Sequence, residues 1–174
     1  MSLSFNVAQV GAAASVLRQL GSRASASVHV AIVRACCHVD DVELARAAVD
    51  QIDLEAAPPQ CIADVYGAMI RAHGRRADLP SALGVFEEGC DWIRVGRPEP
   101  DDDPRAETRR NSPRRVDGAW ERAERALYRS IVHVAASAPR GLILASELLE
   151  HLAQTRGVAL TDGCHYTQRV CMIS

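Results

Sequence analysis

The residues of this chain best suited to chemistry are six cysteines and six histidines. Cys36, Cys37 and His38 offer soft metal ligands, but adjacent side chains on a helix point in different directions and cannot converge on one zinc ion. The sequence contains none of the motifs H-E-x-x-H, G-x-S-x-G, G-x-G-x-x-G or the P-loop. We therefore expect no enzyme, no metal site and no cofactor.

Arginine supplies all 20 basic residues, and the chain contains no lysine. The formal net charge is −2, so the chain as a whole does not attract nucleic acid or an acidic membrane over a long range. A local groove lined by arginine would still bind phosphate. The candidates for such a groove are Arg34, Arg71, Arg75 and Arg76.

The stretch Asp64–Glu88 predicts two short amphipathic helices that would place some of these arginines. Apolar residues in each half recur at i, i+3, i+4 and i+7, which is one face of a helix. Gly74 breaks the pattern between the halves, and Asp78 is suited to cap the second helix. The residues of the two stripes are Tyr66, Met69, Ile70 and His73, then Leu79, Ala82, Leu83 and Phe86.

The same pattern occurs again in the chain. Val28–Val49 aligns with Asp64–Glu88 without a gap at an offset of 37 residues, which places His29 under Tyr66. A degenerate third copy is Leu127–Leu152, where one extra residue is needed. Repeats of this length predict a helical array in which neighbouring units share their core.

These copies resemble the pentatricopeptide repeat, a helical hairpin with an early Tyr and an Ala-Leu-x-x-Phe second helix. Here those residues are Tyr66, Ala82, Leu83 and Phe86. The tetratricopeptide signature Trp-x-x-Leu-Gly-x-x-Tyr is absent. The resemblance implies an all-α fold, a right-handed α-solenoid of helix-turn-helix repeats.

The chain also contains stretches outside the repeats. Residues 97–118 are rich in Pro, Arg and acidic residues and predict a disordered charged insertion. In the second repeat the helical pattern runs into Gly89, and Trp92 and Ile93 follow shortly after it. The expected organisation is an N-terminal segment at 1–25, repeat 1 at 26–62, repeat 2 at 63–96, the insertion at 97–118, a degenerate repeat 3 at 119–162, and a partial repeat or truncated end at 163–174.

Two interpretations of the N-terminal segment stay open. No Asp or Glu occurs before Asp40, and an Arg- and Ser-bearing, acid-free start is typical of an organellar transit peptide. The spacing of Val16, Leu17 and Leu20 favours instead a helix of a preceding repeat. Targeting would place the protein in a mitochondrion or plastid, and otherwise in the cytoplasm. No apolar run approaches the ~18–20 residues that span a bilayer, so we expect no membrane partner.

The resemblance implies binding of single-stranded RNA, with one base read per repeat. The family's reading positions, the fifth and the last residue of a repeat, are Val30 with Ile62, Gly67 with Glu124, and Arg129 with Asp162. Val30 and Ile62 cannot hydrogen-bond a base, and Gly67 has no side chain. The candidate RNA-binding residues combine reading positions of the family with two arginines of the expected groove. They are Val30, Ile62, Gly67, Arg71, Arg75, Arg129 and Asp162.

Two hypotheses follow. The first is an organellar RNA-binding protein acting in RNA processing, stability or translation, with other proteins of a ribonucleoprotein complex as further partners. The second is a protein–protein interaction scaffold built on the same helical repeats. A groove lined by arginine favours RNA. A groove lined by Val30, Gly67 and other small apolar residues favours a peptide.

Overall fold

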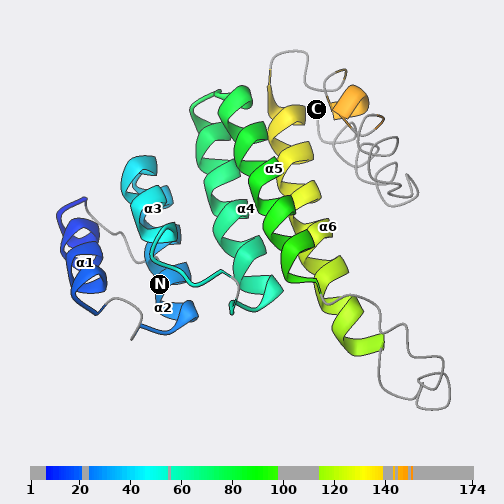
Figure 1. The fold of residues 1–174 in the computed structure, drawn as a ribbon. Helices are drawn as coiled ribbons and strands as arrows, with labels where there is room; N and C mark the ends of the chain where they lie inside the picture. The colour runs from blue at the N-terminus through cyan, green and yellow to red at the C-terminus, as the bar shows by residue number, and fades with distance from the viewer. Residues whose placement is uncertain are drawn as a thin grey trace, which may run out of the picture.

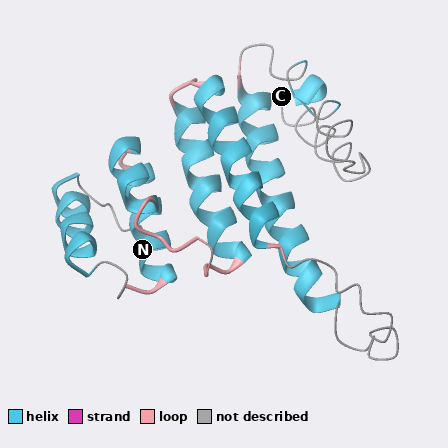
Figure 2. Cartoon of the chain, in the orientation of Figure 1, coloured by secondary structure: helices cyan, strands magenta, loops and turns pink. Residues whose placement is uncertain are grey.

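A computed structural model describes residues 7–20, 24–54, 56–97, 114–138, 143, 145–148 and 150. All regular structure in these ranges is helical, and they contain no strand (Figure 2). The predicted all-α class is therefore confirmed. The helices are α1 (Val7–Leu20), α2 (Ala26–His38), α3 (Val42–Val49), α4 (Pro59–Arg75), α5 (Leu79–Gly96) and α6 (Arg114–Ser137), and further helical residues lie within 143–150.

Helix α4 is the centre of the packing. It contacts α2 and α3 on one side and α5 and α6 on the other, and α1 packs against α2 and α3 (Figure 1). Helices α2, α4 and α6 therefore touch one another in chain order. Helix α3 packs on α2 and α4, and α5 packs on α4 and α6.

The turn between α2 and α3 has the same backbone geometry as the turn between α4 and α5. The residue before each helix cap has a positive φ, 64° at Asp40 and 56° at Ala77. The cap carboxylates of Asp41 and Asp78 accept hydrogen bonds from the backbone N–H three residues later, at 3.0 and 3.1 Å. Such a cap satisfies an amide that the helix leaves unpaired. The duplication at an offset of 37 residues thus extends to individual hydrogen bonds.

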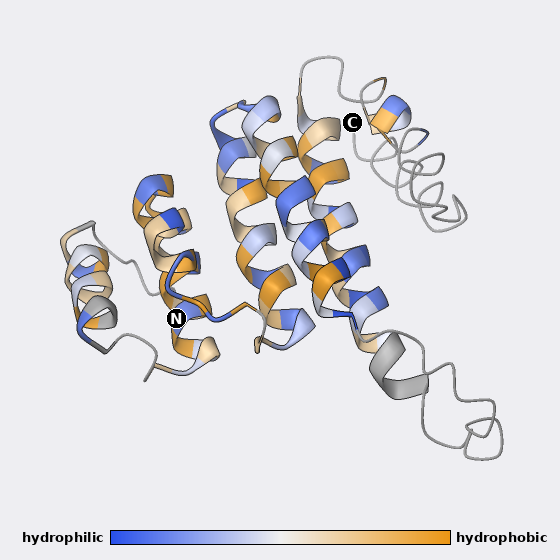
Figure 3. Ribbon diagram, in the orientation of Figure 1, coloured by the Kyte–Doolittle hydropathy of each residue, from blue (hydrophilic) through white to orange (hydrophobic). Residues whose placement is uncertain are grey.

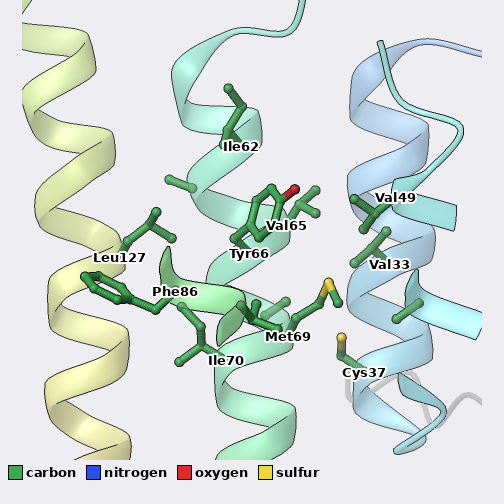
Figure 4. Close-up of a cluster of buried hydrophobic side chains, with 14 of the residues drawn as sticks. Val33, Cys37, Val49, Ile62, Val65, Tyr66, Met69, Ile70, Phe86 and Leu127 are labelled. Carbon is green, nitrogen blue, oxygen red and sulfur yellow. The ribbon is translucent and has the colours of Figure 1, made fainter. Parts of the chain in front are cut away.

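The core is built from the apolar stripes of these helices. Met69 extends from α4 toward Val33 and Cys37 of α2, while Phe86 and Leu127 lie on the α6 side of α4 (Figure 4). All five side chains are at most 3% exposed. Burial of a side chain of this size contributes about 1.5–3 kcal/mol. Polar residues alternate with the apolar stripes along each helix (Figure 3), as amphipathic helices require.

The helix bounds can be compared with the expected organisation. Helix α5 continues through Gly89 and ends at Gly96, the expected end of repeat 2. Helix α4 begins at Pro59, before the expected repeat boundary, because proline suits the first helical turn, where no N–H partner is needed. Helix α6 begins at Arg114, inside the segment predicted as disordered. Once a helix has formed, adding residues of high helix propensity such as arginine costs little free energy. Residues 98–113 and 151–174 lie outside the described part.

Candidate nucleic-acid interface

Three exposed arginines gather where α2 meets α4. Arg34 lies on α2, and Arg71 and Arg75 lie on α4. Arg34 and Arg71 occupy equivalent positions of the two hairpins, 37 residues apart. Burial, and then the like charges of Arg34 and Arg75, lower the pKa of Arg71 from its ordinary value. We call Arg34, Arg71 and Arg75 the arginine cluster.

Hydrogen bonds hold two of these side chains in place. Arg71 Nη1 donates to Ser130 Oγ of α6 at 3.1 Å, and Ser130 Oγ donates to the Ala126 carbonyl at 3.0 Å. Arg75 donates to the Cys37 carbonyl, near the C-terminal end of α2 where the helix dipole favours a cation. Arg34 forms no hydrogen bond or ion pair with the described residues. The cluster therefore combines two fixed guanidinium groups with a free one.

No described carboxylate neutralises the cluster through an ion pair. Asp64 is the one carboxylate that acts on the pKa of Arg71, and its Oδ1 already accepts a hydrogen bond from Gln60 at 3.0 Å. Other arginines are paired: Arg46 with Glu88 at 2.6 Å, Arg76 with Asp40 at 3.0 Å, and Arg94 with Asp91 at 3.1 Å. Arginine stays charged at all physiological pH values. The cluster is thus a site of unbalanced positive charge, which suits an oxyanion.

The structure brings only some of the predicted site residues to this surface. Ile62 is fully buried, with 0% exposure, so it cannot touch a surface ligand. Val30 is half-buried and packs against the core. Gly67 is buried beneath Arg71 and Ser130. Arg129 is exposed on α6, next in the chain to Ser130. Asp162 lies outside the described residues.

Two further corrections concern polar residues. Arg76, expected in the same groove, instead pairs with Asp40 in the turn of the first hairpin. Ser130 was missed by the sequence reasoning. A single serine between Arg129 and an apolar run carries no pattern of its own, and it gains its role only because α6 packs on α4. The periodicity of Asp64–Glu88 held no information about that contact.

The cysteines in the described ranges form no second site. Cys36 and Cys37 are buried, and burial raises the pKa of each thiol to about 11. Across the described ranges, no three His, Cys, Asp or Glu residues are placed to hold a metal ion. In those ranges, too, no helix has the length and apolar character needed to cross a bilayer.

Comparisons of the chain with protein families, with curated proteins and with solved structures give no match. A functional assignment therefore depends on the geometry of the arginine cluster.

Proposed function

We propose that this protein binds single-stranded RNA and that the arginine cluster neutralises the RNA phosphates. The observation that carries the proposal is the unpaired charge of Arg34, Arg71 and Arg75. Most affinity for nucleic acid comes from such contacts, because each neutralised phosphate releases condensed counterions. Arginine also matches phosphate geometry with two parallel N–H donors.

Ser130 supports this role for Arg71. Its Oγ accepts from Arg71 Nη1, so one donor of the guanidinium is occupied and the others stay available. A side chain already held in place loses less conformational entropy when it binds a ligand. Arg71 is thus a partly pre-organised phosphate ligand, and Arg34 can adapt to the position of a second phosphate.

The proposed architecture is a right-handed α-solenoid of pentatricopeptide-like hairpins. The recurrence of the Asp41 and Asp78 turns supports repeated hairpins, as does the contact of α2, α4 and α6 in chain order. In such an array the first helices of successive hairpins share one surface. The cluster lies on α2 and α4, and exposed Arg129 lies on α6, which would be the first helix of the third hairpin.

The test is fluorescence anisotropy with a labelled single-stranded RNA of mixed sequence. Arg34→Ala is the cleanest probe, because Arg34 holds no other element in place. Its loss is expected to weaken binding about tenfold, since one charge-assisted contact contributes more than 1 kcal/mol. Arg94→Ala on α5 is the matched control. It removes the same charge from an exposed helical arginine that is paired with Asp91, and it should change the affinity by less than about twofold.

Equal losses in the two variants would show that overall charge, not the cluster, drives binding. Absence of saturable binding would reject the proposal. A protein-interaction scaffold would then be the better candidate. It is favoured by apolar surface beside Arg34 on α2, where Val28 is 41% exposed and Ala31 is also exposed.

A further inference from the structure

The side chains around the arginine cluster indicate whether it contacts the phosphates or the bases of the RNA. One turn before Arg34 lie Val30 and Ala31, and one turn before Arg71 lie Gly67 and Ala68. None of these four side chains has a polar atom. A base is distinguished by hydrogen bonds to its edge or by a shaped pocket. The neighbours one turn before Arg34 and Arg71 therefore offer no polar side-chain atom to the edge of a base.

The space above Gly67 is also filled. A Cβ placed there would lie 3.2 Å from Ser130 Oγ and 3.3 Å from Arg71 Nη1. The guanidinium of Arg71 therefore occupies the position that a longer side chain at residue 67 would use. Ser130 holds it there through the hydrogen bond across to α6. The Arg71 guanidinium, which can bind any phosphate, therefore lies where a side chain at residue 67 could otherwise contact a base.

Among the described residues, no Phe, Tyr or Trp ring is fully exposed for stacking on a base. The rings of Tyr66, Phe86, Trp120 and Tyr128 are buried, and Trp92 is half-buried on α5, away from α2. Stacking contributes about 1–3 kcal/mol per base in proteins that use it. Without such rings, the contacts that this surface offers to RNA come chiefly from the charged guanidinium groups.

We infer that the cluster binds the phosphate backbone of single-stranded RNA without regard to base sequence. This inference rests on the proposed function and narrows it. Asp64, whose charge acts on Arg71, repels phosphate, and its Oδ1 already accepts a hydrogen bond from Gln60. Binding should therefore be weak, steep in its dependence on salt and uniform across sequences.

The test compares oligo(A), oligo(C) and oligo(U) of one length, about 20 nucleotides, by anisotropy at one salt concentration. We expect the three dissociation constants to agree within about threefold, and Arg34→Ala to raise all three by the same factor. Tenfold tighter binding to one homopolymer, or a loss with Arg34→Ala confined to one, would overturn the inference and leave RNA binding standing. No binding to any of them would overturn both.

Discussion

Gly89 is a residue whose role comes from packing. A Cβ at Gly89 would lie 2.8 Å from Tyr66 Cγ and 3.0 Å from Leu127 Cδ1, so α5 approaches α4 and α6 at this point too closely for a side chain. Gly84 lies on the same helix with nothing within 4 Å of its virtual Cβ. The two glycines thus share a helix and differ in their surroundings.

This difference predicts opposite effects of the same substitution. Gly84→Ala should stabilise the protein by about 0.5–1 kcal/mol, because alanine loses less backbone entropy in a helix. Gly89→Ala should destabilise it by about 1–3 kcal/mol, because the ring of Tyr66 must move. Urea denaturation followed by circular dichroism measures both. Effects of the same sign would contradict the packing of α5 against Tyr66.

Among the helices, the second hairpin (α4 and α5) has more side-chain hydrogen bonds between its helices than the first (α2 and α3) at equivalent positions. Tyr66 Oη donates to Glu88 Oε1 at 3.0 Å, and Arg46 of α3 donates to both oxygens of Glu88, at 2.6 and 2.8 Å. Three helices meet in this network. The equivalent residues of the first hairpin, 37 positions earlier, are His29 and Gln51. There His29 Nε2 and Gln51 Oε1 are both buried without a hydrogen-bond partner.

His29→Tyr should therefore stabilise the first hairpin. A tyrosine places a hydroxyl about where Tyr66 places its own in the second hairpin, and Gln51 Oε1 can accept from it. The substitution exchanges the His29 Nδ1 contact with the Ser25 carbonyl at 3.1 Å for a bond to Gln51 Oε1, and it removes the buried, unpartnered Nε2. The expected net gain is about 1 kcal/mol. Tyr66→Phe is the paired control and should cost a similar amount by removing the bond to Glu88. Destabilisation by His29→Tyr in a urea titration would show that the two hairpins are not equivalent at this position.

The hairpins were predictable from sequence because their signals are local. The spacing of apolar residues and the caps Asp41 and Asp78 act within one helix or turn, and both appear in the structure. The continuation of α5 through Gly89 was not predictable, since glycine signals a helix end unless the neighbouring ring is known. The residues of the candidate site likewise divide into those predictable from local pattern and those that depend on tertiary packing. Arg71 and Arg75 follow from the helix pattern, but Ser130 depends on how α6 packs.

For the whole molecule, net charge conceals an uneven distribution. The value of −2 sums all 22 acidic and 20 basic residues of the sequence, whereas the arginine cluster on α2 and α4 forms no ion pair with a described carboxylate. Several of the acidic residues are engaged with arginines of their own layer, such as Glu88 with Arg46. A protein of slightly negative charge can therefore present a positive surface. The acidic residues on α3 and α5 are Glu43, Glu87, Glu88 and Asp91.

The buried thiols predict a loss of stability in alkali. Burial raises the pKa of Cys36 and Cys37 from 9.0 to about 11, so the folded state favours the protonated thiols. Their contribution is complete below about pH 9 and is lost as the pH rises through 11. Burial, and then the charge of Glu88, also raise the pKa of Tyr66, which adds a loss above pH 10.

The melting temperature should accordingly stay level from about pH 7 to 9 and fall toward pH 11. The Cys36→Ala/Cys37→Ala variant should melt lower at neutral pH because of the missing sulfur atoms. Its melting temperature should nevertheless fall less steeply over the alkaline range. An unchanged slope in this variant would mean that the thiols do not cause the alkaline loss.

The most direct test of phosphate neutralisation by the arginine cluster is the salt dependence of RNA affinity. For single strands, the slope of log K against log salt is about −0.7 for each phosphate neutralised. Three arginines predict a slope near −2 for the unmodified protein, and Arg34→Ala should reduce its magnitude by about 0.7. Arg94→Ala should leave the slope unchanged. A slope near zero, or one that Arg34→Ala does not alter, would contradict phosphate binding by the cluster.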